Sequence, residues 1–255
     1  MRHLVTPIRM KLLAFETATE ACSVAVYVDG EVRERFEIAP RRHAELALPW
    51  AEQLLADAGL SRSQLDAVAL SRGPGAFTGV RLAIAIAQGI ALALDRPLLP
   101  VSTLAVLAAQ VPAPAVLAGE GGCDVGAPHA ILAAIDARMG EVYTGTFVRQ
   151  GEDLFATTEE AVIAPADYRL PGDAIGWIGV GTGFAAAEGA LATALQARLA
   201  RIDAQALPHA ADLARLAVQA WQRGEAIAPE RVEPAYLRNN VALTLEEQKA
   251  LRASR

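Results

Sequence analysis

The chain opens with short apolar runs that are typical of β-strands. These runs cover residues 11–16, 22–28 and 32–38, and Asp29-Gly30 between the last two is a turn signal. We therefore expect the first part of the chain to form a three-stranded antiparallel meander.

A helical pattern follows over residues 43–58. Its apolar residues recur at helical spacing, and the pattern ends at Gly59, a residue type that favours a helix C-terminus. Pro49 lies inside this pattern, where a proline removes one backbone hydrogen bond. We expect either a kink at Pro49 or a helix that begins after His43.

Strands and helices then alternate around a glycine-rich loop. Residues 65–70 predict a buried parallel strand, residues 71–79 form the loop, and residues 80–94 predict a long apolar helix. A strand at 97–101 leads through Ser102 into another helix. Because three strands precede the first helix, this order differs from a Rossmann unit and indicates another α/β class.

A second lobe is predicted after a stretch rich in Pro, Gly and Ala. Its strands are expected at 130–136, 141–148 and 177–180. We expect a first lobe at 10–111 and a second, smaller lobe at 112–208. A last amphipathic helix at 209–224 is expected to rejoin the first lobe, and residues 225–255 form an extension. This extension is expected to be partly disordered, with a charged, loosely held end at 243–255.

Composition narrows the class of protein. The 255 residues are 53% hydrophobic and 20% charged, which is typical of a globular chain, and the formal net charge of −6 argues against a free-standing nucleic-acid binder. The first ten residues lack the apolar stretch of a secretory signal, and either Met1 or Met10 can be the native start. Residues 82–94 are too few to cross a bilayer. We expect a cytoplasmic protein without a membrane segment.

No metal site or nucleophile stands out. Cys22 and Cys123 are about a hundred residues apart, and no two of the four histidines have metal-ligand spacing. There is no Gly-x-Ser-x-Gly elbow. We therefore predict no catalytic residues and no metal.

Four segments are candidate nucleotide or phosphate loops. Each has a structural alternative that the residues leave open: a tight turn, a capped solvent-exposed turn, a hairpin, or close packing of a loop on a neighbouring strand. The candidate residues are Glu16, Thr17, Gly73, Gly75, Thr78, Gly79, Asp136, Gly181 and Gly183. We also expect Arg138 and Glu141 to pair across a hairpin that turns at Gly140.

The helix at 80–94 is apolar nearly all round. Small residues at alternate positions keep it thin, so it demands burial on every side. In a small domain, one of those sides can be covered by another chain.

Three segments together resemble one protein family. They are Glu16-Thr17-Ala18-Thr19 before a strand, residues 73–81 with Gly89 downstream, and residues 135–143. This combination is similar to the bacterial TsaB (YeaZ) family, and the resemblance runs from Met10 to about Asn239.

The resemblance implies an actin-like ATPase fold with two lobes, each a mixed sheet flanked by helices. It implies a non-catalytic subunit that binds a homologous catalytic subunit, TsaD, and works with the P-loop ATPase TsaE. Together they form N6-threonylcarbamoyladenosine at position 37 of ANN-decoding tRNAs, with tRNA bound only through the complex. The chain is then expected to have no cofactor of its own, although ATP or ADP can be bound in the complex.

The resemblance also implies a partner interface on two helices. Its predicted members are His43, Leu46, Trp50, Leu54, Arg81, Ile84, Gln88 and Leu92. Without the partner, the same surface can form a homodimer. Two other hypotheses remain: a phosphotransferase of the same fold, weakened by a first loop without Asp-x-Gly, and an inert nucleotide-binding module.

Overall fold

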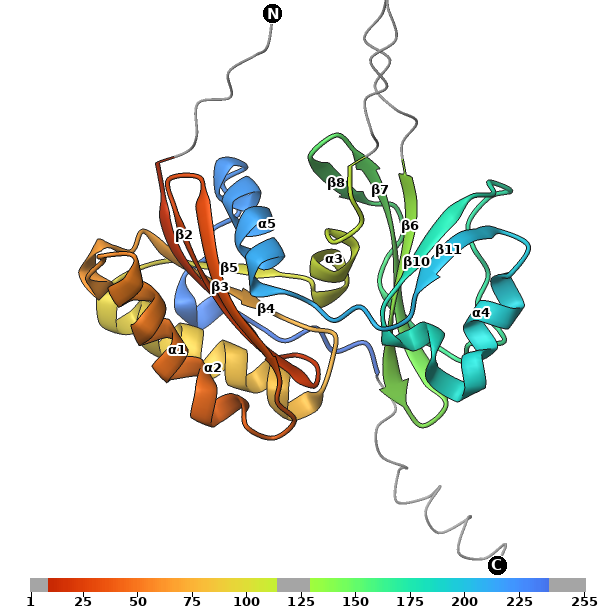
Figure 1. The fold of residues 1–255 in the computed structure, drawn as a ribbon, viewed down its shortest axis with the longest axis horizontal. Helices are drawn as coiled ribbons and strands as arrows, with labels where there is room; N and C mark the ends of the chain where they lie inside the picture. The colour runs from red at the N-terminus through yellow and green to blue at the C-terminus, as the bar shows by residue number, and fades with distance from the viewer. Residues whose placement is uncertain (1–8, 114–128, 239–255) are drawn as a thin grey trace, which may run out of the picture.

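The computed structural model describes residues 9–113 and 129–238, and it contains two sheets that lie side by side with helices between them and outside them (Figure 1). The first sheet has the strand order β3-β2-β1-β4-β5 and the second β11-β10-β6-β7-β8, with β9 paired to β7. We call these lobe 1 and lobe 2. This is the two-lobed, mixed-sheet architecture that the sequence predicts.

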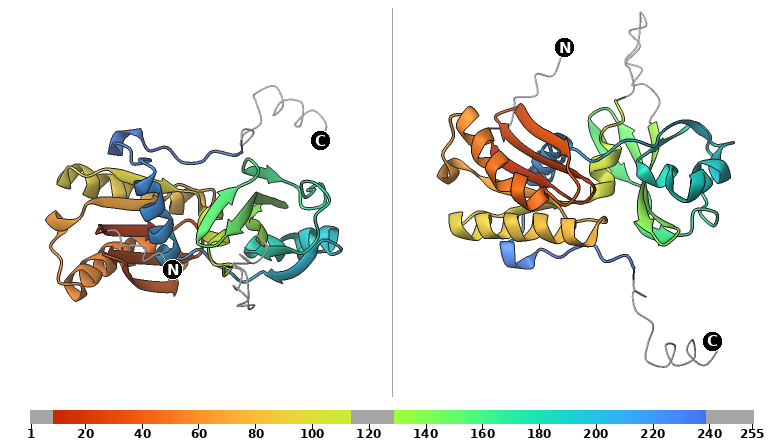
Figure 2. Two further views of the ribbon diagram at one scale, coloured as in Figure 1. Left: turned by 90° about the horizontal axis from the view of Figure 1, so that it is seen from above. Right: turned by 60° about the horizontal axis from the view of Figure 1, so that its bottom comes forward.

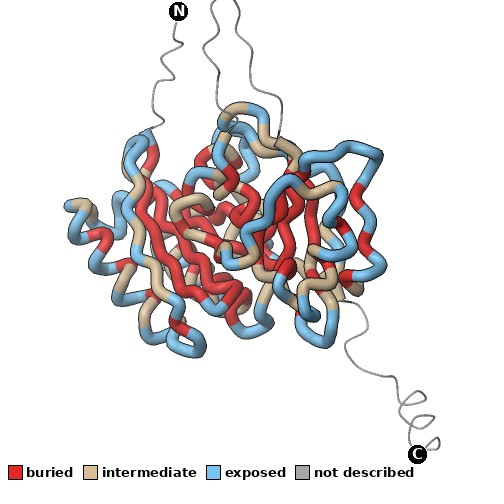
Figure 3. The backbone as a smooth tube through the Cα atoms, turned by 45° about the vertical axis from the view of Figure 1, so that its right-hand side comes forward, coloured by how far each residue is buried: buried red, intermediate tan, exposed pale blue. Residues whose placement is uncertain are grey.

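Lobe 1 begins with the predicted meander. Strands β1 (Lys11–Glu16), β2 (Ala21–Val28) and β3 (Glu31–Ile38) are antiparallel, whereas β4 (Ala67–Ser71) and β5 (Leu98–Val101) run parallel to β1. Strands β1, β2 and β4 are almost wholly buried because helices cover both of their faces. Figure 3 shows this concentration of buried backbone.

Two helices cover the outer face of this sheet. Helix α1 (His43–Asp57) contains Pro49, so the expectation that the helix begins later than His43 is wrong. Helix α2 (Phe77–Leu94) begins three residues earlier than predicted and ends at Asp95, which adopts a left-handed conformation. Within this chain α2 is buried on part of its surface only, because the side chain of Leu92 is 63% exposed, and the covering of that side by another chain stays a prediction. The short helix η1 (Arg62–Gln64) precedes β4.

Helix α2 is long and apolar enough to cross a membrane by length and composition alone. Its packing gives a sufficient reason for that composition. Val80, Ala83, Ile84 and Ala87 are buried against the sheet in the main core of lobe 1, as expected for the core helix of a folded domain.

Helices α3 (Thr103–Ala108) and α5 (Ala210–Gln222) lie between the two sheets (Figure 1). Helix α5 packs through Leu213, Ala214 and Ala217 on the inner face of lobe 1. The apolar side chains Leu104 and Leu107 of α3 instead join the core of lobe 2. The boundary predicted between residues 111 and 112 therefore falls after a helix that packs with the second lobe.

Lobe 2 repeats the strand topology of lobe 1. Strands β6 (His129–Arg138), β7 (Glu141–Gln150) and β8 (Asp153–Ala156) form an antiparallel meander, and β10 (Trp177–Val180) and β11 (Leu199–Asp203) run parallel to β6. The remaining elements of this lobe are β9 (Ala161–Ile163), η2 (Thr182–Phe184), η3 (Ala186–Gly189) and α4 (Ala190–Leu195).

After α5 the chain returns to lobe 1 and runs along α2 (Figure 2). Backbone hydrogen bonds join Ile227 to Leu98, and Gln88 of α2 donates a 2.8 Å hydrogen bond to the carbonyl of Pro229 in η4 (Pro229–Arg231). The described part of the predicted extension is thus packed on the fold. The stretch rich in Pro, Gly and Ala, which the sequence predicts to be a linker at 112–128, lies mostly outside the described residues, as does the end at 243–255.

Candidate functional site

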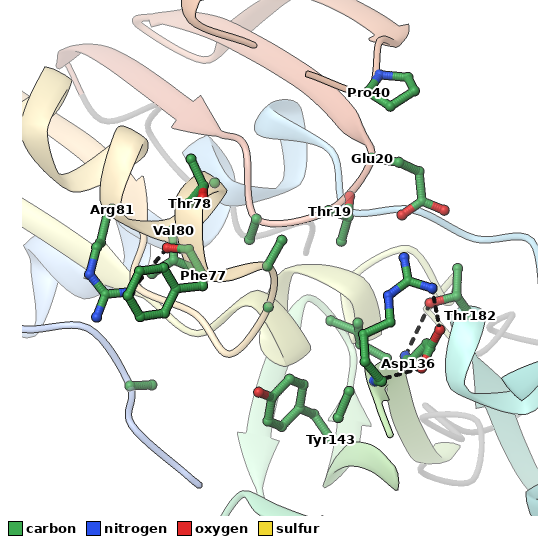
Figure 4. A pocket seen from close by; sticks show the side chains of 18 of the residues that line it. Thr19, Glu20, Pro40, Phe77, Thr78, Val80, Arg81, Asp136, Tyr143 and Thr182 are labelled. Atoms are coloured by element: carbon green, nitrogen blue, oxygen red, sulfur yellow. Dashed lines mark hydrogen bonds and ion pairs between the residues drawn. The ribbon is translucent and has the colours of Figure 1, made fainter. Parts of the chain in front are cut away.

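A cavity of about 1220 Å³ lies between the lobes (Figure 4). Lobe 1 lines it with the turn after β1 and the start of α2, and lobe 2 with the β6–β7 hairpin and Thr182. The segment 234–238 completes the wall. Of the predicted loop residues, the cavity includes Gly75, Thr78, Gly79 and Asp136. Glu16, Thr17, Gly73, Gly181 and Gly183 do not line it.

The glycine-rich loop is closed by its own chain. The hydroxyl of Thr17 donates a 2.7 Å hydrogen bond to the carbonyl of Gly79, and the amide of Ala76 donates one of 2.7 Å to the carbonyl of Ala18. A Cβ on Gly75 or Gly79 would overlap the carbonyl oxygen of Ala18 or Thr17. These glycines therefore allow two backbone segments to touch, and the space beside them is filled by backbone.

Glu16 lies at the end of β1 and is fully buried. One carboxylate oxygen accepts a 2.7 Å hydrogen bond from the amide of Ala18, whereas the other has no partner among the described residues. Burial raises its pKa to about 7, although the hydrogen bond from Ala18, the nearby Ser71 side chain and the charge of His209 act in the opposite direction. Its side chain belongs to the interior of lobe 1 and lies outside the cavity wall.

A polar network lies beside Glu16 at the start of α5. The carboxylate of Glu34 accepts hydrogen bonds from Ser23 at 2.7 Å, from His209 at 3.0 Å and from the amide of Ala211 at 3.0 Å. The His209 ring also stacks on Phe36, with centroids 4.1 Å apart. This network ties the N-terminus of α5 to β2 and β3. The amide of Ala210 also donates a 2.9 Å hydrogen bond to the hydroxyl of Ser23, and sequence reasoning missed the network because this bond joins residues 187 positions apart.

The corresponding loop of lobe 2 is also tightly packed. Gly181 has a φ of +110°, and a Cβ on Gly183 would lie 2.7 Å from the Cβ of Ala134 on β6. Of the two alternatives left open by the sequence, the geometry corresponds to close packing on a neighbouring strand.

The β6–β7 hairpin differs from its prediction. Arg138 pairs with Asp136 at 2.8 Å, and Glu141 pairs with Arg238, so the predicted pair between Arg138 and Glu141 is wrong. Asp136 and Arg138 sit on one strand before the turn, and the left-handed conformation of Arg138 directs the chain into that turn. The competing partner, Arg238, lies 97 residues away.

Segment 234–238 bridges the two lobes across the cavity. On lobe 1, the amide of Ala235 donates to the carbonyl of Arg72, and Arg81 donates a 2.6 Å hydrogen bond to the hydroxyl of Tyr236. On lobe 2, Arg238 reaches Glu141 and the carbonyl of Ala137. The sequence placed these residues in an extension and gave no signal for their role.

The predicted partner interface is divided by the structure. Leu92 is exposed, and His43, Leu46 and Trp50 are half-buried on α1. Leu54 and Ile84 are buried in the core of lobe 1, so they support the helices from behind. Arg81 and Gln88 contact the returning C-terminal segment of the same chain. Leu48 of α1, which is not among the predicted members, is also exposed.

Within residues 9–113 and 129–238, no group of three or more His, Cys, Asp or Glu side chains is placed to hold a metal ion. Cys22 is buried, and burial raises the pKa of its thiol to about 12, which keeps it protonated at neutral pH.

The repeated topology of two sheets around an interlobe cavity defines the class of protein, a chain with an actin-like ATPase fold. The family model described as "TsaD: tRNA N6-adenosine threonylcarbamoyltransferase" matches residues 36–245. Among solved structures, YeaZ from Pseudomonas aeruginosa is 43% identical with a TM-score of 0.77, over 89% of this chain and 100% of that one.

Two relatives carry the same name, "tRNA threonylcarbamoyladenosine biosynthesis protein TsaB". The relative from Escherichia coli is 39% identical over 91% of this chain and 96% of its own length. The relative from Haemophilus influenzae is 37% identical over 91% and 95%. The chain belongs to the TsaB (YeaZ) family, as the sequence motifs indicate.

Proposed function

We propose that this chain is a non-catalytic subunit in the formation of N6-threonylcarbamoyladenosine in tRNA, and that it acts by binding a homologous catalytic subunit of the TsaD type. The names of its relatives support the pathway, and the match of residues 36–245 to the TsaD family model supports homology between this chain and the catalytic subunit. In this proposal the complex works in the cytoplasm, includes the ATPase TsaE and contacts position 37 of ANN-decoding tRNAs.

The observation that carries the proposal is the outer face of α1 and α2. Leu48 is 47% exposed and Leu92 is 63% exposed, on helices whose other faces already cover the sheet. Small residues at Ala85, Gly89 and Ala93 leave this face of α2 open to close approach by another helix. An apolar, thin helix face of this kind is suited to a helical partner.

The test is co-purification with the catalytic homologue. Leu92→Asp and Leu48→Asp place a charge in the proposed interface, and Ile175→Asp, at an apolar residue of lobe 2 that is 78% exposed, is the matched control. We expect the first two variants to lose the partner and the control to retain it, because an unpaired charge at an interface centre is costly. Retention of the partner by all three variants would contradict the proposed interface.

These positions are preferable to Ile84→Asp, which would also affect the fold. Ile84 is buried in the core of lobe 1, so a charge there would destabilise the chain itself. Trp50→Ala is a milder test, since Trp50 is half-buried against the same core.

The non-catalytic role is supported by the closed glycine loop and by the inward position of Glu16, which leave a phosphate group no acidic partner from β1. We expect the purified chain to hydrolyse no ATP, and calorimetry to detect no ATP or ADP unless the partner is present. ATP turnover by the chain alone would favour a phosphotransferase and contradict this proposal. Without the partner, we expect the Leu92 face to form a homodimer that Leu92→Asp converts to a monomer.

A further inference from the structure

An aromatic and arginine stack stands at the edge of the interlobe cavity. The guanidinium of Arg81 lies 3.3 Å from the ring centroid of Phe77 and 5.2 Å from that of Tyr236. Phe77 is nevertheless 70% exposed and Tyr236 is 63% exposed. Figure 4 shows Phe77 and Arg81 facing each other beside the cavity. The stack therefore holds two rings in place while it leaves much of their surface to solvent.

The stack continues across the cavity mouth to lobe 2. Tyr236 is followed by Arg238, which contacts the sulfur of Met139 at 3.2 Å and reaches Glu141 on the β6–β7 hairpin. Tyr143 lines the same cavity from β7. Residues from three distant parts of the chain thus form one rim rich in aromatic and arginine side chains.

The charge of the cavity is opposite to that of the chain. Its lining contains four arginines and two carboxylates, although the whole chain has a net charge of −6. Arg138 and Arg238 are paired with carboxylates, but within the described residues neither Arg41 nor Arg81 forms an ion pair. A concave surface of one sign concentrates ligands of the other sign, so the cavity favours an anionic ligand.

The lining is also selective for the kind of anion. All of its permanent cations are arginines, whose planar groups bind phosphate in two-pronged geometry and stack on rings. Exposed aromatic rings beside a basic groove are the arrangement that binds unpaired bases. The cavity, at about 1220 Å³, exceeds the usual range of small-molecule pockets and has room for more than one nucleotide.

The chemistry of the proposed function requires an unpaired base. The N6 amino group of adenosine lies on the edge that pairs with uracil, and enzymes that modify a base act on it when it is single-stranded or flipped out of the stack. Single-stranded RNA loops are recognised mainly by stacking on aromatic and arginine side chains.

We propose that the Phe77, Arg81 and Tyr236 stack binds unpaired nucleotides of the tRNA loop that is modified, with the cavity arginines holding the phosphates. This inference rests on the proposed function and adds an RNA-binding role to a subunit that would otherwise only support its partner. An acidic peptide could pair with the arginines, but it would leave the exposed ring faces without a use.

The test uses the assembled complex with the catalytic homologue. Phe77→Ala and Tyr236→Ala remove the rings, and Phe155→Ala is the matched control, because Phe155 is 54% exposed on β8 away from the cavity. We expect each ring variant to raise the KM for tRNA about tenfold with little change in kcat, since stacking of one base contributes about 1–3 kcal/mol. The control should leave both constants unchanged.

A second measurement identifies the contact directly. An RNA stem–loop with a photoreactive uridine in its loop is cross-linked to the complex, and the labelled peptides are identified by mass spectrometry. We expect labels on peptides that contain Phe77 or Tyr236, and none when the photoreactive base is moved into the stem.

The outcomes separate this inference from the proposed function. Unchanged KM values and no label on this chain, in a complex that assembles and is active, would overturn the RNA site alone. Loss of the partner in Phe77→Ala or Tyr236→Ala, with Phe155→Ala retaining it, would assign the stack to a protein contact and also overturn the RNA site. Failure of the unmodified chain to assemble would contradict the proposed function instead.

Discussion

The two lobes share one topology but place their acidic residues differently. In lobe 1, Glu16 ends the first strand and is fully buried, with its pKa raised to about 7. In lobe 2, Asp136 lies near the end of the equivalent strand, lines the cavity and pairs with Arg138. The carboxyl end of the first strand therefore carries a buried acid in lobe 1 and an acid of the cavity wall in lobe 2.

The difference arises in the loops that follow. In lobe 1 the glycine-rich loop presses on Thr17 and Ala18, and the start of α5 covers Glu16 from the inner side. In lobe 2 the loop after β10 packs on Ala134, two residues before Asp136, and the side chain of Asp136 stays 29% exposed. Among the described residues, the acidic groups that line the cavity are Glu20 after β1 and Asp136 on β6, and they belong to no group of three or more side chains placed to hold a metal ion.

The largest expected effect tests the closure of the lobe 1 loop. In Gly79→Ala the new methyl group would overlap the carbonyl oxygen of Thr17, and backbone cannot move aside as a flexible side chain can. We expect the free energy of unfolding, measured by urea titration, to fall by more than about 3 kcal/mol.

Gly89→Ala is the matched control in the same helix. Within residues 9–113 and 129–238, no atom outside the adjoining helix backbone lies within 4 Å of its Cβ position, and alanine favours a helix, so the free energy of unfolding should rise by about 0.5–1 kcal/mol. A loss of less than about 1 kcal/mol in Gly79→Ala would show that the loop is not closed against Thr17.

Local patterns predicted most of the fold but only part of the site. The meander, β10 and both outer helices follow from apolar spacing and turn residues, which are properties of neighbouring positions. The burial of Glu16 depends on α5, and the partner of Glu141 is Arg238, so both are set by contacts between distant segments. A single sequence contains no direct signal for such contacts.

The second prediction concerns Glu16→Gln and its dependence on pH. Because folding raises the pKa of Glu16 from 4.5 to about 7, the native state binds the proton more tightly than the unfolded state does. Stability should therefore fall as the pH rises from 4.5 to 7 and level off above that range.

Glutamine can still accept the hydrogen bond from Ala18, but it has no charge to bury. We therefore compare the free energy of unfolding of Glu16→Gln with that of the unmodified chain, by urea titration. We expect the advantage of the variant to grow by about 2–3 kcal/mol as the pH rises from about 5 to about 8. A difference that does not change with pH would place the Glu16 carboxyl in contact with water, as in lobe 2.

The third prediction tests the network beside Glu16. The hydrogen bond to Glu34 raises the pKa of His209 above 6.5, so its stabilising contribution is complete at lower pH and is lost as the pH rises through the raised value. His209→Gln should lower the free energy of unfolding by about 1 kcal/mol at low pH and by less at high pH. The effect is small because the ion pair is partly exposed.

Stacking on Phe36 is also lost in His209→Gln, but that loss does not vary with pH. The pH-dependent part of the difference therefore reports the ion pair alone. An equal loss of stability at every pH would attribute the role of His209 to stacking.

The smallest expected effect belongs to the acid on the other side of the cavity. Asp136→Asn removes a surface ion pair with Arg138, whose side chain is 82% exposed, and the amide oxygen of asparagine can still accept the hydrogen bond from the backbone of Arg138. We expect stability to change by less than about 0.5 kcal/mol at any pH. When the free energies of unfolding of Asp136→Asn and Glu16→Gln are measured under the same conditions, the comparison tests whether burial of the carboxylate causes the different pH dependence in the two lobes. Both substitutions neutralise one carboxylate near the end of a first strand. A pH-dependent gain in stability in Asp136→Asn as large as that in Glu16→Gln would mean that the lobe 2 carboxylate is buried as well. Neither first strand would then place an acidic group in the cavity wall.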